Sequence, residues 1–179
     1  MSGLEKKSVM NASRVLRRLV EIEEEGMTFY EEMSKLATSP WTRKFAKWLC
    51  DAEEAHRKYF LRMAERAEAN ETREDTPLFE LADEVLALLS ARVLPSVDQL
   101  RIEAPYTTDT EAVRLAIQVE DRAFRLMARL TTVVAREQRG YMERVVQEEL
   151  DHKTKLEELL GILHTGRPMP DDLGGVQTG

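Results

Sequence analysis

The chain has 179 residues, of which 42% are hydrophobic and 33% are charged, and this balance suits one globular domain with a sizeable core. The formal net charge of −7 argues against binding to nucleic acid or to anionic membranes. A single cysteine excludes an internal disulfide and any multi-cysteine metal site. No apolar run approaches the roughly 20 residues that span a bilayer, and the N-terminus lacks a signal-peptide core. We therefore expect a cytoplasmic protein that binds neither nucleic acid nor membrane.

Apolar residues with helical periodicity predict a first long helix at residues 9–38 and a second at residues 40–69. Ser39 is a favourable N-cap residue for the second helix, and Pro40 suits its first position. A connection this short between two long helices predicts an antiparallel helical hairpin.

The second half of the chain predicts another pair of helices. The third helix begins near Thr108, which has capping-box spacing with Glu111, and it extends to about residue 134. A polar turn then leads into a fourth helix at residues 138–164. These two helices form a second predicted hairpin.

About forty residues connect the two hairpins. Within them, residues 77–94 predict one short amphipathic helix, and residues 95–107 an irregular strap. A connection of this length can run the full length of a bundle. The expected fold is therefore all-α: a four-helix bundle of two helical hairpins joined by a long crossover that contains a short extra helix. Residues 1–166 form this bundle domain, and residues 167–179 are expected to be a flexible C-terminal tail.

Each long helix carries an apolar stripe for burial, and each stripe is interrupted by polar residues. The apolar members are Leu16, Val20, Met27 and Tyr30, then Ala46, Leu49, Phe60, Met63 and Ala67, then Val113, Phe124, Met127 and Val134, then Met142, Val145, Leu156, Leu159 and Leu163. The polar residues that interrupt the stripes are Glu23, Glu53, His56, Glu120, Glu149 and His152. Burying four carboxylates together without a cation would cost several kcal/mol for each uncompensated charge.

The interrupting residues repeat along the chain. Glu53 and His56 form a Glu-x-x-His pair, and Glu149 and His152 form another, with an offset of 96 positions between them. Within each hairpin the glutamates lie 14 to 16 residues from the turn, which places them within about 3 Å of the same height. The repeat suggests two similar hairpins related by a pseudo-twofold axis, whose polar side chains converge at mid-bundle.

A pair of divalent metal ions would compensate these charges. The i, i+3 spacing sets a carboxylate beside an imidazole on one helix face. Oxygen and imidazole donors without a thiolate favour iron or manganese, with zinc as an alternative. A small rotation of a helix would exchange a neighbouring glutamate, Glu24, Glu54 or Glu148, for the inward one.

The pattern resembles the ferritin-like di-iron carboxylate proteins, most closely their rubrerythrin-type branch. The segment EIEEEGMTFYEEM resembles the first-helix signature, and EEAH and EELDH resemble the two Glu-x-x-His helices, so that the resemblance covers residues 9–164. The ligands it implies are Glu23, Glu53 and His56 for one half of a site for two iron ions, and Glu120, Glu149 and His152 for the other. Glu53 and Glu149 would be the bridging ligands.

Three departures from the rubrerythrins limit what the resemblance implies. Rubrerythrins proper carry a rubredoxin-like module with four cysteine ligands, whereas this sequence has one cysteine, so electrons would come from a separate donor protein. Ala123 stands where rubrerythrins have an extra glutamate associated with peroxidase cycling. Met127 in the second repeat stands where the first has Tyr30, so any tyrosine role is confined to one side.

Several neighbouring residues have two interpretations. Tyr30 either packs in the core with a satisfied hydroxyl or acts beside the metal. Trp41 and Trp48 are expected to pack against the crossover or against a second subunit. Asp121 and Asp151 adjoin proposed ligands and either orient them or are solvated surface charges.

The function that the resemblance implies is that of a di-iron oxidoreductase, which oxidises Fe(II) or reduces oxygen or hydrogen peroxide. The expected protein is a homodimer. An iron storage or sequestration protein is one alternative, and a bundle with a purely structural metal site is another.

Overall fold

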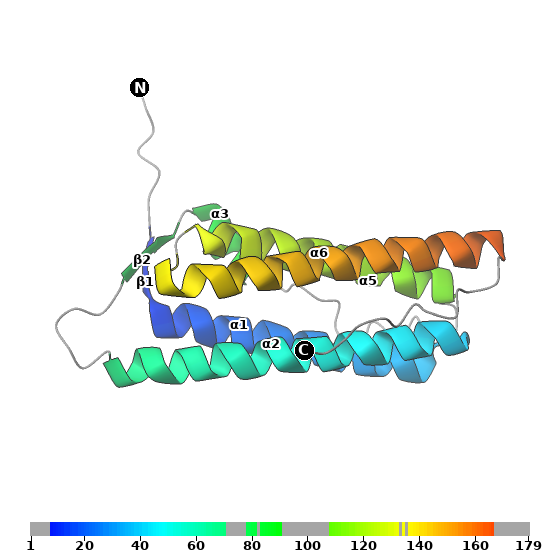
Figure 1. Cartoon of the computed structure of the whole chain (residues 1–179), viewed down its shortest axis with the longest axis horizontal. Helices are drawn as coiled ribbons and strands as arrows, with labels where there is room; N and C mark the ends of the chain where they lie inside the picture. Colours follow the sequence, from blue (N-terminus) through cyan, green and yellow to red (C-terminus); the bar gives the residue numbers. More distant parts are fainter. Residues whose placement is uncertain are drawn as a thin grey trace, which may run out of the picture.

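Four long helices form two antiparallel hairpins in this computed structural model, which describes residues 8–70, 78–81, 83–90, 108–132, 134 and 136–166. Helices α1 and α2 form one hairpin and α5 and α6 the other, and all four run side by side (Figure 1). In chain order the elements are β1 (Ser8–Asn11), α1 (Ala12–Leu36), α2 (Pro40–Asn70), β2 (Leu78–Leu81), α3 (Asp83–Ser90), α5 (Asp109–Thr131) and α6 (Arg136–Thr165). The predicted all-α bundle is confirmed.

Helix ends follow the predicted capping signals. The Ser39 hydroxyl accepts hydrogen bonds from the backbone N–H groups at the start of α2, and Pro40 is the first residue of that helix. Thr108 and Glu111 form a complete capping box at the start of α5. The carboxylate of Asp109, in the first turn of α5, accepts hydrogen bonds from the backbone N–H groups of Thr38 and Ser39 at 3.1 and 2.6 Å. This contact joins the tip of the first hairpin to the beginning of the second.

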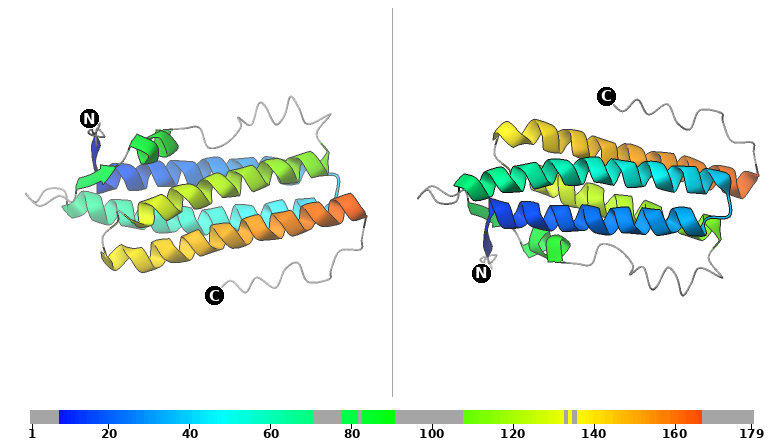
Figure 2. Two further views of the ribbon diagram at one scale, coloured as in Figure 1. Left: turned by 90° about the horizontal axis from the view of Figure 1, so that it is seen from above. Right: turned by 90° about the horizontal axis from the view of Figure 1, so that it is seen from below.

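The crossover connects opposite ends of the bundle, because α2 ends at one end and α5 begins at the other (Figure 1). Helix α3 belongs to this connection and packs beside α1 and α5, with Val85 and Leu89 buried (Figure 2). The expected strap at residues 95–107 and the expected tail at residues 167–179 lie outside the described residues.

A two-stranded antiparallel ribbon is the main departure from the predicted elements. Ser8 pairs with Leu81 and Asn11 pairs with Leu78, so α1 begins at Ala12 rather than at residue 9. The single helix expected over residues 77–94 is replaced by β2 followed by the eight-residue α3. The segments SVMN and LFEL contain Val and Phe, which favour strands once a partner strand is in reach.

The core follows the predicted stripes closely. Most stripe residues are buried, among them Leu16, Leu49, Phe60, Met127, Met142, Leu156 and Leu159. Phe124 is an exception and is only half-buried, because the buried face of α5 runs through Ala123 and Met127 instead. No helix of the described residues is long and apolar enough to cross a membrane.

Candidate metal centre

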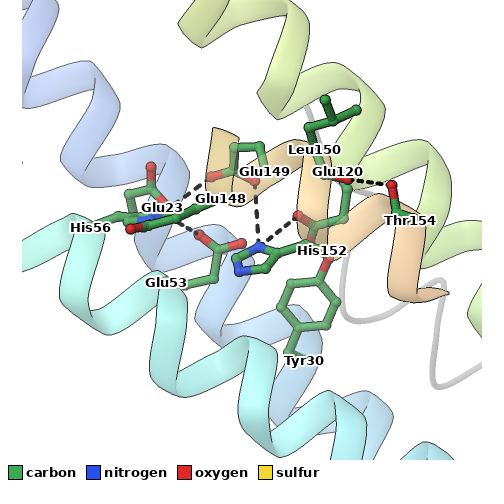
Figure 3. Close-up of polar contacts among 10 residues, drawn as sticks. All are labelled: Glu23, Tyr30, Glu53, His56, Glu120, Glu148, Glu149, Leu150, His152 and Thr154. Carbon is green, nitrogen blue, oxygen red and sulfur yellow. Dashed lines mark hydrogen bonds and ion pairs between the residues drawn. The ribbon is translucent and has the colours of Figure 1, made fainter. Parts of the chain in front are cut away.

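All four long helices send polar side chains into the core near their midpoints (Figure 3). Each of these side chains belongs to a residue that is at most 4% exposed. They are Glu23 from α1, Glu53 and His56 from α2, Glu120 from α5, and Glu149 and His152 from α6. The six residues singled out in the sequence are therefore buried together, and their expected convergence is confirmed.

Two groups of potential metal-ligating atoms share one residue. In each group the atoms lie within 4.8 Å of one another. The first group is Glu23, Glu53, His56 and Glu149, and the second is Glu120, Glu149 and His152. Glu149 thus belongs to both groups, whereas Glu53 belongs only to the first.

The structure also determines which of the adjacent glutamates point inward. Glu24 is exposed, with Oε1 3.4 Å from an Arg57 nitrogen, and Glu54 pairs with Lys58 at 2.8 Å. The Glu148 side chain is 56% exposed, although its Oε2 reaches Nε2 of His56 at 2.8 Å. The inward positions are therefore those chosen from the sequence pattern.

Burial and mutual repulsion raise the pKa of three carboxyl groups. Burial raises the pKa of Glu23 well above its usual value, and the charges of nearby glutamates add to the effect. The pKa of Glu120 rises to about 8, because the group is buried and because Glu149 carries a negative charge beside it. Burial also raises the pKa of Glu53. Each of these carboxyl groups therefore binds its proton more tightly than an exposed carboxyl group does.

At the two imidazoles and at Glu149, contacts between opposite charges outweigh the effect of burial on the pKa. Burial alone would lower the pKa of His56, but its contacts with Glu148 and Glu149 outweigh burial and raise it to about 10. In the same way, contacts with Glu120 and Glu149 overcome burial and raise the pKa of His152. Burial would raise the pKa of Glu149, yet the two histidines hold it below its usual range. The shifts of these three groups therefore all favour a negative charge on Glu149 and positive charges on the two imidazoles.

The hydrogen bonding around Glu149 is incomplete. Its Oε1 lies 3.1 Å from Nδ1 of His56, but neither carboxylate oxygen has a partner in hydrogen-bond geometry, nor does that Nδ1. A buried carboxylate without hydrogen-bond partners is costly, and a bound cation would compensate for their absence. The oxygen and imidazole donors fit divalent iron or manganese, so the residues present suit a metal pair.

Tyr30 contacts the centre directly. It is fully buried in α1, and its hydroxyl donates a hydrogen bond to Oε1 of Glu120 (Figure 3). Its ring also packs edge-to-face on Phe29, with ring centroids 5.0 Å apart. Tyr30 therefore packs in the core with a satisfied hydroxyl, as the first interpretation expected, and its role beside a metal stays a prediction.

Sequence analysis missed Gly26. This buried glycine lies in α1, one turn after Glu23, and a Cβ atom added to it would lie 3.1 Å from Cδ of Glu53. The space that its missing side chain leaves is therefore used by the Glu53 carboxylate. A glycine inside a long amphipathic helix, on its inward face, was the available signal.

Near the two imidazoles, Trp48 lies where it was not expected, whereas the two aspartates match their interpretation as surface charges. Trp48 packs edge-to-face on His152, with ring centroids 4.8 Å apart, so its position is explained within the bundle. Asp121 pairs with Lys153 at 2.7 Å, and Asp151 accepts a hydrogen bond from Gln147 at 2.8 Å. The contacts of both aspartates are thus with surface residues, and Glu148 is the carboxylate that meets a histidine of the centre from outside.

The two helical hairpins have a ferritin-like fold, and buried carboxylate–histidine clusters lie between them. A Thermotoga maritima structure, described as that of a candidate ferritin-like diiron-carboxylate protein, superposes with a TM-score of 0.66 at 22% identity, over 87% of this chain and 98% of that one. A hypothetical protein from Pyrococcus furiosus gives a TM-score of 0.59 at 16% identity, over 88% and 92% of the two chains. At these identities the likeness concerns the fold.

The rubrerythrin family model matches residues 14–160, which include most of each long helix and all six polar core residues. This chain therefore belongs to the rubrerythrin family. No curated protein matches its sequence.

Proposed function

We propose that this protein holds two iron ions between its hairpins and acts as a di-iron oxidoreductase that oxidises Fe(II) or reduces oxygen or hydrogen peroxide. The observation that carries the proposal is Glu149, a buried carboxylate without hydrogen-bond partners that is common to two groups of ligand atoms. Membership of the rubrerythrin family supports iron as the metal.

The ligand assignment follows the two groups. Glu23, Glu53 and His56 would hold one ion, Glu120 and His152 the other, and Glu149 would bridge them. The bridging role expected for Glu53 stays a prediction, because this residue belongs to the first group only. When bound, a pair of iron ions would supply one electron each to an oxidant.

The protein residues prepare the site for such a pair. The two imidazoles face the centre with Nδ1, which must lose its proton before it can bind metal. Tyr30 holds Glu120 by a hydrogen bond, and all six polar residues are at most 4% exposed, which keeps bulk water from the centre. The result is a pre-formed and dry donor set.

Two further parts of the proposal concern its reactants. The sequence has one cysteine, so we infer that reducing equivalents come from a separate donor protein. Ala123 stands where rubrerythrins have an extra glutamate that is associated with peroxidase cycling. The absence of that glutamate favours oxygen over peroxide as the oxidant.

Anaerobic loading with Fe(II), followed by oxygen or peroxide, tests this proposal. A di-iron oxidoreductase should bind two equivalents of iron and form an optical band that appears and decays over repeated turnovers. Retention of ferric iron far above two equivalents would indicate storage instead. Tight zinc binding without any redox change would indicate a structural metal.

Adjacent glutamates provide a matched control for the ligand assignment. Glu53→Ala should abolish metal binding in the first group, because this side chain points into the core. Glu54→Ala, the next residue along α2, removes only a surface ion pair with Lys58 and should leave iron binding unchanged. Equal metal content in the two variants would contradict the assignment.

A further inference from the structure

The two imidazoles of the centre differ in the carboxylates that contact their Nε2 atoms. His56 points Nδ1 toward Glu149 and places Nε2 2.8 Å from a carboxylate oxygen of Glu148 (Figure 3). Both carboxylates that contact His152, Glu120 and Glu149, approach Nδ1 at 3.2 and 3.8 Å. The ring of His152 packs edge-to-face on Trp48, and among the described residues no carboxylate contacts its Nε2.

A carboxylate on the outer nitrogen changes what an imidazole can do. With Nε2–H donating to Glu148, the lone pair of a neutral His56 is left on Nδ1, which is the nitrogen that faces Glu149. The negative charge of the acceptor makes the ring a stronger donor, and the hydrogen bond fixes its orientation. Glu148 itself is half-exposed and stays outside both ligand groups.

In the other half of the centre, His152 has no such carboxylate partner among the described residues. The edge-to-face contact with Trp48 orients the ring of His152 but supplies no negative charge, and the Lys155 ammonium lies 4.7 Å from the centroid of the Trp48 ring. Glu120 already accepts a hydrogen bond from Tyr30, which draws charge away from its oxygen. This half also offers three ligand groups where the first offers four.

We propose that Glu148 is a positioning residue that makes the His56 half of the centre the tighter metal position, so that the two positions fill in sequence with this one first. The inference rests on the proposed metal centre. It adds the order in which the two positions bind metal and names Glu148 as the residue that determines this order. The two halves resemble each other in sequence, but they are not equivalent in chemistry.

The test uses cobalt(II) titrations of the full-length apo protein, followed by visible absorption and by calorimetry. His152→Ala removes the weaker half and should leave one tight position, whereas His56→Ala should leave one weaker position. In the His152→Ala background, Glu148→Ala should weaken binding ten- to a hundredfold, as expected when an outer carboxylate partner of a metal-bound histidine is lost. Glu148→Gln keeps an uncharged acceptor and should weaken binding less.

Two controls make the result specific to Glu148. Glu143→Ala removes another exposed carboxylate from α6 and should leave both affinities unchanged. Glu148→Ala in the His56→Ala background should also have little effect, because the remaining position does not contact Glu148. If the half-site variants fail to fold by circular dichroism, the two binding steps of the wild type and of Glu148→Ala, measured alone, decide the question.

The outcomes separate this inference from the proposed function. Two unequal steps, of which the first is selectively weakened in Glu148→Ala, support the inference. Two steps of equal affinity, or a first step that is insensitive to Glu148, overturn it while leaving the metal centre intact. A wild-type protein that binds no cobalt would overturn the proposed centre itself.

Discussion

Gly26 of α1 and Glu53 of α2 are packed so closely that a Cβ atom on Gly26 would lie 3.1 Å from Cδ and 3.3 Å from Cγ of the glutamate. Glycine in a helix interior is less stable than alanine by roughly 0.5–1 kcal/mol. The helix bears this cost at a position where the missing side chain makes room for a buried carboxylate.

Gly26→Ala should therefore separate helix stability from metal binding. Because the new methyl group forces Glu53 to move, we expect the metal affinity to fall roughly tenfold or more, as for other misplaced site residues. Gly161→Ala is the matched control, since a Cβ there meets nothing within 4 Å, and it should raise the stability of the apo protein without affecting metal. Wild-type affinity in Gly26→Ala, measured by calorimetry, would show that Glu53 does not need this space.

Substitution of Glu149 and substitution of Glu120 should remove different numbers of metal ions. Glu149 belongs to both ligand groups, so Glu149→Ala should reduce the metal content from two ions to none. Glu120 belongs to the second group only, so Glu120→Ala should retain one ion. Elemental analysis after anaerobic loading and desalting measures both numbers. Retention of one ion by Glu149→Ala would mean that the two positions do not share this ligand.

Metal binding should release protons and should tighten as the pH rises from about 6.5 to 8. The pKa values of His56, about 10, and Glu120, about 8, lie above their usual values, so both groups carry protons in the apo protein in this range. Ligands must lose these protons to bind metal. Zinc titrations in weak buffer with a pH indicator measure the release directly.

The same shifts predict the opposite trend for the apo protein. Because the folded state binds more protons than the unfolded state between the usual and the raised pKa values, the free energy of unfolding should fall as the pH rises through this range. Glu149, whose pKa is lowered, affects stability only in acid. A metal-induced rise in melting temperature that grows with pH would agree with both trends, and one that shrinks would contradict them.

Tyr30→Phe should test the orienting hydrogen bond without removing a ligand. The change strips Glu120 of its hydroxyl partner, and we expect the free energy of unfolding of the apo protein to fall by about 1 kcal/mol. Both metal ions should remain, because Tyr30 is in neither ligand group. Tyr59→Phe, which removes a hydroxyl from a half-buried tyrosine that stacks on Tyr141, is the control. Chemical denaturation and metal analysis measure the two effects. Loss of metal in Tyr30→Phe would show that the tyrosine is needed for metal binding and not only for the orientation of Glu120.

The sequence by itself determined the four long helices and most of their inward faces. Helical periodicity is a local property, so the stripes around Leu49 and Met142 could be read from residue spacing alone. The capping box of Thr108 and Glu111 is local for the same reason. The Glu-x-x-His pairs were recognisable because three residues make almost one helical turn and set both side chains on one face.

Only the tertiary structure decided the contacts between helices that define the centre. Whether Glu148 or Glu149 points inward depends on a rotation of α6 that adjacent residues in the sequence do not specify. Three contacts join residues of different helices: Glu148 with His56, Trp48 with His152, and Gly26 with Glu53. The pairing of β1 with β2 likewise joins segments about seventy residues apart. Such contacts arise from how whole helices and strands pack against one another, and residue spacing within a single element carries no information about them.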